Sequence, residues 1–386
     1  MAFCTASGEK NHRANAAIPA SGNRILLAIQ QDTSRSGQGT KASAQQAIQL
    51  VEQLSSQRFQ ERDQATRKLA AMGMTAVAAL QAGLESSDAE VRSRCQAILA
   101  DVIGRDFEDR VKRFQADPDG TDGYGLPGFD AYTQLLGNTP ATRTLFANML
   151  EQSRGVMMAL SRDPEELAVA IDTQIVNVSH IMESPAAMAA LFFASSRPNV
   201  RCETPTLDML NFLSTSRVFT EMATTGPGAE ACQSILNEWI TANGDLVRPA
   251  DCVYMALRYG LPAGLPLAQS LAADPGADAN DRMHAVLAVA KLGDASHSGL
   301  LVKLFDEQDV CLTYANTNWE AQLRDIALAC VLHLKGEDPK DFGFVNRERS
   351  DATLYTPVTL SFAGERERQL AFAKYHARFG RRPDRN

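Results

Sequence analysis

The strongest constraint on how this chain can fold is an internal repeat. When the sequence is shifted against itself by 220 residues, an arginine, two alanines, two large apolar residues and a glycine align with residues of the same kind. The first copy contains Arg62, Ala65, Leu69, Ala70, Met72 and Gly73, and the second contains Arg282, Ala285, Val289, Ala290, Leu292 and Gly293. A shift of 262 residues adds a third copy, which begins at Arg324. The apolar spacing is that of one face of a helix, so each copy predicts an amphipathic helix.

The repeat continues into a second helix. Leu80 and Leu84 align with Leu300 and Leu304 at the shift of 220 residues. Two short antiparallel helices cannot bury both apolar faces alone, so successive pairs must stack into a shared core. Strand patterns are nearly absent, and the proline in the β-branched segment Thr353–Phe362 limits that segment to an edge or extended structure. We therefore expect an all-α fold built as an α-solenoid, or helical-repeat array.

The arginine of the repeat stands three residues before an alanine whose small side chain allows helices to approach closely. Its guanidinium has five donors and can bridge two elements, so we expect it to reach a carboxylate or the carbonyl end of a neighbouring helix. The alternative is a ligand-binding arginine. Positions that recur in every unit of a solenoid normally serve the stacking.

These segments resemble the HEAT-repeat family. The segments that look like the start of a HEAT-like unit are Arg62 to Gly73, Arg282 to Asp294 and Leu323 to Ala329. Segments 126–129, 257–261 and 333–344 are similar to long bacterial HEAT-repeat proteins of uncharacterised function. The resemblance implies an α-solenoid that binds or organises partners, and it supplies no catalytic residue.

The pattern of repeats and breaks divides the chain into five parts. The apolar patch Ile25–Ile29 is short and late for a secretory signal, so the first part is expected to be a disordered leader or a degenerate export segment. The compartment stays open between cytoplasmic and exported. The five parts are a leader over 1–43, HEAT-like repeats over 44–106, an irregular helical region over 107–274, further HEAT-like repeats over 275–345, and an extended segment with a capping helix over 346–386.

Several helix ends can be predicted from capping residues. Thr139, Asp163 and Ser184 each precede a proline, a combination typical of an N-cap followed by the first helical residue. A capping box at Ser87 to Glu90 opens a helix that is expected to end at Gly104. The C-terminal residues 364–379 form an amphipathic, basic helix, which either caps the end of the array or binds an anionic membrane or an acidic partner.

Charge, hydropathy and cysteine content exclude several classes of protein. The chain has 38 Lys and Arg against 46 Asp and Glu, a net charge of −8, which argues against a general nucleic-acid binder. No apolar run approaches the roughly 18 to 20 residues that span a bilayer, so we expect no transmembrane segment. The seven cysteines form no closely spaced pair, and we expect buried, reduced thiols.

Three groups of residues contain side chains that could bind a metal ion or take part in catalysis. For each group a structural role is the simpler interpretation. The acidic segment Asp117 to Gly123 could hold Ca²⁺, but it fails the EF-hand pattern and reads as a surface loop. The acids Asp163, Glu165 and Glu166 are explained by helix capping. The remaining group comprises Cys330 and His333 together with Cys311, His284 and His297, where core packing is favoured over a metal or a nucleophilic cysteine.

The sequence therefore predicts no catalytic, cofactor-binding or metal-binding residues. The function that it favours is a non-catalytic scaffold or adaptor that binds protein partners of unknown identity through an inner helical face. The alternative is a lyase-type enzyme on the same scaffold, by analogy with the bilin lyases that carry HEAT-like repeats. A third hypothesis is an adaptor that the basic C-terminal helix anchors to membranes.

Overall fold

The computed structural model describes residues 39–313 and 319–380. The chain divides into two compact units, residues 1–107 (unit 1) and 108–386 (unit 2). Both are mostly helical, as predicted. Most of the predicted leader, residues 1–38, lies outside the described residues. Helix α2 already begins at Gly39, inside the segment expected to be the leader.

Unit 1 is built from the first copy of the repeat and its neighbours. Its core contains Ala65, Leu69 and Leu80, the positions that the repeat predicts to be buried. Gly73 ends helix α3 with φ at +58°, a conformation that favours glycine. The elements are α2 (Gly39–Gln53), α3 (Phe59–Met72), the 3₁₀ turn η1 (Gly73–Ala76), α4 (Val77–Gly83) and α5 (Ala89–Gln115), which continues into unit 2.

The structure corrects both expected ends of helix α5. Its first residue is Ala89, so the capping residue is Asp88 rather than Ser87, and the Asp88 carboxylate accepts a hydrogen bond of 2.8 Å from the Glu90 amide. The helix also passes through Gly104 and ends only at Gln115. A glycine inside a helix costs about 1 kcal/mol, and the burial of the apolar stripe beyond it, which includes Phe114, outweighs that cost.

The first half of unit 2 packs around one buried helix, α11, in which every residue from Ala186 to Ser195 is buried. It contacts helices α7, α8, α9, α12, α13 and α14. The predicted N-caps are confirmed, because the side chains of Thr139, Asp163 and Ser184 accept hydrogen bonds at the starts of α7, α9 and α11. The helices are α6 (Phe129–Leu136), α7 (Pro140–Gln152), α8 (Arg154–Ala159), α9 (Pro164–Ile175), α10 (Val178–Met182), α11 (Pro185–Ser195), α12 (Thr204–Ser214), α13 (Arg217–Thr225) and α14 (Ala229–Asn243).

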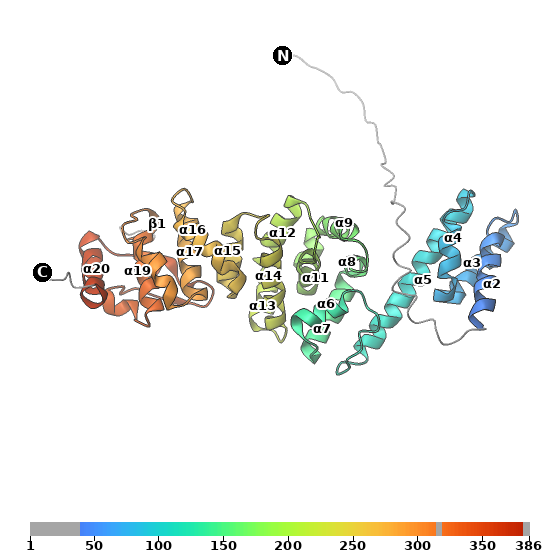
Figure 1. Cartoon of the computed structure of the whole chain (residues 1–386), viewed down its shortest axis with the longest axis horizontal. Helices are drawn as coiled ribbons and strands as arrows, with labels where there is room; N and C mark the ends of the chain where they lie inside the picture. The colour runs from blue at the N-terminus through green and yellow to red at the C-terminus, as the bar shows by residue number, and fades with distance from the viewer. Residues whose placement is uncertain (1–38, 314–318, 381–386) are drawn as a thin grey trace, which may run out of the picture. The chain divides into compact units, whose positions relative to one another are not determined.

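The second half of unit 2 contains the other two copies of the repeat, and its helices lie side by side in chain order (Figure 1). Helices α15, α16, α17 and α19 share one apolar core with α20. The helices and 3₁₀ turns are α15 (Pro249–Tyr259), η2 (Pro262–Gly264), α16 (Leu265–Ala273), α17 (Ala279–Leu292), η3 (Ala295–His297), α18 (Ser298–Val302), α19 (Leu323–Leu334), η4 (Pro339–Phe342), η5 (Pro357–Leu360) and α20 (Glu365–Phe379).

Two short antiparallel strand pairs interrupt the helices of this half. Strands β1 (Val310–Thr313) and β2 (Glu320–Gln322) pair just before α19, where the sequence analysis expected none. Strands β3 (Arg349–Ser350) and β4 (Leu354–Tyr355) form the second pair. The expectation of an extended segment over Thr353–Phe362 is only partly right, because Pro357 starts the 3₁₀ turn η5 instead of an edge strand.

The copies of the repeat fold into matching local structure. Helices α3 and α17 have 14 residues each, and their first residues, Phe59 and Ala279, stand 220 positions apart. In each case a 3₁₀ turn and a second helix follow. The third copy coincides with α19, where Ala327 is fully buried, like Ala65 and Ala285. None of the helices in the described ranges is long and apolar enough to cross a bilayer.

Candidate functional site

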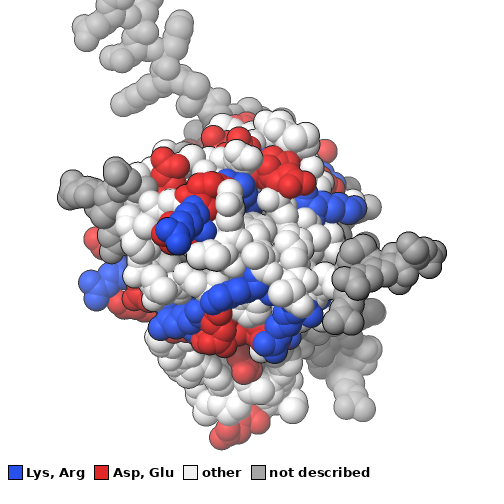
Figure 2. All heavy atoms as spheres, turned by 90° about the vertical axis from the view of Figure 1, so that its left-hand side faces the viewer, with Lys and Arg blue, Asp and Glu red and all other residues white. Residues whose placement is uncertain are grey.

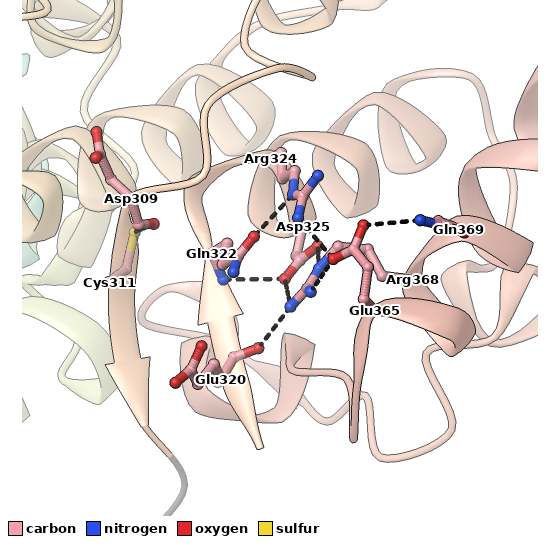
Figure 3. A network of polar contacts seen from close by, with 9 residues as sticks. All are labelled: Asp309, Cys311, Glu320, Gln322, Arg324, Asp325, Glu365, Arg368 and Gln369. Carbon is pink, nitrogen blue, oxygen red and sulfur yellow. Dashed lines mark hydrogen bonds and ion pairs between the residues drawn. The ribbon is translucent and has the colours of Figure 1, made fainter. Parts of the chain in front are cut away.

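A buried polar cluster joins helices α19 and α20 (Figure 3). Asp325 is fully buried, and its two carboxylate oxygens accept hydrogen bonds of 2.8 and 3.0 Å from the guanidinium of Arg368. The Gln322 amide donates to the same carboxylate at 3.0 Å. Glu365 accepts hydrogen bonds of 2.8 Å from both Arg368 and Arg324.

This cluster serves to fix α20 on the core. Burial raises the pKa of the Asp325 carboxyl, while the adjacent Arg368 opposes that shift. Both oxygens of Asp325 accept hydrogen bonds from protein donors and both partners are buried, so the pair is closed to a ligand from solvent. Ala371 and Tyr375 of α20 are buried as well. On the face of the molecule that carries α20, acidic and basic side chains are intermingled (Figure 2), which does not give the uniformly basic face that an anionic membrane attracts.

The repeat arginines behave as the sequence analysis expected. Arg62 donates to the Ser56 carbonyl, in the loop before its own helix, at 2.8 Å, and it lies 3.8 Å from the Glu90 carboxylate of α5. Arg282 donates to the carbonyl of Ala272, in the last turn of α16, at 3.4 Å. Arg324 forms an ion pair with Glu365 at 2.8 Å. Each guanidinium therefore reaches a helix-end carbonyl or a carboxylate, which agrees with a role in packing.

The predicted acidic loop is held together by its own side chains. The Asp117 carboxylate accepts a hydrogen bond of 2.9 Å from the Tyr124 hydroxyl, and the Asp122 carboxylate accepts one of 2.6 Å from the Tyr124 amide. The buried Arg143 donates to the Asp122 carbonyl at 3.2 Å. Its guanidinium lies 3.9 Å from the centre of the Phe114 ring, a cation–π contact.

The cysteines and histidines considered as metal ligands do not converge. Cys330 is fully buried, and burial raises the pKa of its thiol; burial also raises the pKa of Cys311, to about 12. His297 pairs with Asp294, and His284 lines the groove described next. Within the described ranges, no group of three or more His, Cys, Asp or Glu side chains is placed to hold a metal ion.

A groove of about 370 Å³ crosses the exposed sides of α12, α15 and α17, and we call it the α12–α15–α17 groove. Its volume is at the small end of the range for ligand pockets, which is about 300–1,000 Å³. It is partly open to solvent rather than an enclosed cavity. The lining residues are Asp208, Asn211, Phe212 and Thr215 near α12, Arg248, Ala250, Asp251 and Tyr254 near α15, and Asn280, Asp281 and His284 on α17.

Helical spacing explains why these side chains meet. On α12 the groove residues Asp208, Asn211 and Phe212 are three and four positions apart and therefore share one face. The opposite face of α12 buries Leu207, Leu210 and Leu213. Contacts of α15 with both α12 and α17 bring the three exposed faces together. The groove is thus a consequence of the side-by-side packing of helices that are far apart in the sequence.

The groove carries an excess of negative charge. Arg248 donates to Asp251 at 2.7 Å and lies 3.5 Å from Asp281, so that one guanidinium serves two carboxylates. Burial lowers the pKa of His284, which favours the neutral imidazole near pH 7. The lining therefore holds three carboxylates against one guanidinium, a formal charge of −2.

Two aromatic side chains open into the groove from different helices. Phe212 is 53% exposed, and Tyr254 is 37% exposed, although only 6% of the chain is aromatic. The ring of Tyr254 meets that of His284 edge to face, with 5.3 Å between the ring centres. Exposed aromatic rings in a concave setting are typical of protein-binding sites, because they bury a large area on contact.

Comparisons with known proteins assign no function to this groove. No family model, no curated protein and no solved structure matches the chain. From the sequence, His284 is a candidate only as a metal ligand, and neither Phe212 nor Arg248 stands out. The sequence signal for this site is a polar and aromatic face on the helix that follows Glu203. Such faces are common in helical proteins, so this one marks a site only when the positions of α15 and α17 are known.

Proposed function

We propose that this chain is a non-catalytic scaffold or adaptor, built on a HEAT-like helical array, that binds a partner protein through the α12–α15–α17 groove. The observation that carries the proposal is the groove itself, where three packed helices present Phe212 and Tyr254 to solvent beside three carboxylates that outnumber the single guanidinium of the lining, Arg248. Exposed aromatic side chains of this kind dominate the binding energy of many interfaces.

The HEAT-like part of the proposal is supported by the repeat. Helices α3, α17 and α19 place the same arginine and the same buried alanine at matching positions. Arrays of such helices use extended surfaces across several units to bind partners. The open form of the groove favours binding over the lyase-type alternative, because sites that carry out chemistry on a small molecule usually enclose most of its surface.

A photo-crosslinking experiment tests the proposal. A photoreactive benzoylphenylalanine replaces Phe212 in the full chain, and the protein is irradiated in an extract of the cells that produce it. The matched control carries the same amino acid at Val169, which is 64% exposed on α9 and outside the groove. We expect discrete protein adducts from position 212 and few or none from position 169. Equal adduct patterns at the two positions, or none at 212, would contradict the proposal.

A further inference from the structure

The groove has unused capacity for a positive charge. Arg248 is shared between Asp251 and Asp281, and its contact with Asp281 is long at 3.5 Å. Among the described residues, none forms a hydrogen bond or an ion pair with the side chain of Asp208. The carboxylates of Asp208 and Asp281 therefore retain acceptors that a guanidinium or an ammonium group from outside could use.

The aromatic side chains of the groove favour a ligand that is long and partly apolar as well as positively charged. Phe212 follows Asp208 by four positions and so lies beside it on the same face of α12. Tyr254 follows Asp251 by three positions on α15. A long basic side chain could lay its methylene stem against these rings while its charged end reaches the carboxylates, because both Lys and Arg combine an apolar stem with a charged tip.

Other types of partner segment fit the groove less well. An acidic segment would meet a lining with a formal charge of −2. An entirely apolar segment would remove water from the carboxylates without replacing the lost hydrogen bonds. A volume of about 370 Å³ holds a few side chains and is too small for the long apolar face of a bound amphipathic helix.

We infer that the groove recognises an extended, basic segment of the partner protein, with an arginine or lysine side chain placed between Asp208 and Asp281 and against Phe212 and Tyr254. This inference rests on the proposed function, and it adds the chemistry of the partner. The charge of the groove and its exposed rings are the two observations that carry it.

Peptides of defined composition test the inference on the full chain. Fluorescent decapeptides in a Gly and Ser background carry two arginines, two glutamates or two norleucines, and their binding is followed by fluorescence anisotropy. We expect the arginine peptides to bind most tightly, with an affinity that falls between about 50 mM and 500 mM salt because ions screen exposed charges. Asp208→Lys should weaken their binding by about 5- to 30-fold, as expected for losing one exposed attraction and gaining one repulsion.

Two further variants make the result decisive. Glu230→Lys makes the same charge change at an exposed position of α14 outside the groove, and it should leave the affinity within about twofold, as expected for a remote exposed charge under screening. Phe212→Ser should weaken the arginine peptides by about 2- to 5-fold, in line with the loss of one exposed cation–π contact. Tighter binding of glutamate or norleucine peptides, or equal effects of Asp208→Lys and Glu230→Lys, would overturn the inference. Those outcomes would leave the proposed function intact if the crosslinker at position 212 still captures a protein, whereas failure of the crosslinking would remove both.

Discussion

Replacing Asp325 by asparagine should destabilise unit 2 by about 3 kcal/mol. Both partners of the pair are buried, with side-chain exposures of 0% for Asp325 and 5% for Arg368. Removing one partner of a buried ion pair costs about 3–5 kcal/mol, because it leaves the other charge uncompensated. The lower end of this range applies, because Glu365 stays 2.8 Å from Arg368 and is about half exposed. Asparagine keeps one oxygen for the Gln322 backbone amide, but its NH2 group replaces an oxygen that accepts from Arg368, so the change removes one hydrogen bond to Arg368 together with the charge.

The repeat supplies a matched control for this variant. Asp63 stands at the position equivalent to Asp325, but its side chain is 40% exposed, and within the described ranges it pairs only with Arg67, one helical turn away. Asp63→Asn should therefore cost no more than about 0.3–0.5 kcal/mol. The double variant Asp325→Leu/Arg368→Met should recover most of the lost stability, because buried pairs can often be replaced by apolar residues without loss.

Urea unfolding of the full chain, followed by circular dichroism, measures these differences. Hydrogen exchange of the amides in α19 and α20 assigns the loss to the correct region, since a chain with two units need not unfold in one step. If Asp325→Asn costs no more than Asp63→Asn, or if exchange in α19 and α20 is unchanged, the buried pair does not hold α20 in place.

Three further predictions concern packing, pH and thiol reactivity. Gly264→Ala should cost about 1–3 kcal/mol in urea unfolding, because a Cβ at Gly264 would overlap the methyl group of Ala256; a neutral result would contradict this close approach. Burial lowers the pKa of His284 and of His333 below the ordinary 6.5, so near pH 6 the unfolded chain binds more protons than the folded chain. The melting temperature should therefore fall as the pH drops from about 7.5 to 5.5, and it should fall less in the variant His284→Asn/His333→Asn. Burial raises the pKa of the six described cysteines, so 4,4′-dithiodipyridine should react much more slowly with these six thiols in the folded chain than with the same thiols in urea, and equal rates would show that they are exposed.

Local signals in the sequence predicted the helices and their caps well. The repeat places helices at Phe59–Met72 and Ala279–Leu292, and the side chains of Thr139, Asp163 and Ser184 cap helices as expected. These features depend on residues within one or two helical turns, so the sequence alone contains the information.

Features that depend on distant residues could not be predicted in the same way. Helix α5 continues past Gly104 because packing outweighs the local cost of a glycine. Asp325 and Arg368 are 43 positions apart. The groove combines residues from Asp208 to His284 on three helices, and only the packing of those helices brings the residues together.

Hydrogen exchange of the full chain, with and without the partner captured at position 212, tests the central claim most directly. We predict that binding protects amides in α12, α15 and the first turns of α17, over residues 204–215, 248–259 and 279–284. The exposed face of α9 around Val169 should keep its exchange rate. Protection that is confined to other helices, or no protection in α12 and α15, would show that the groove is not the binding site.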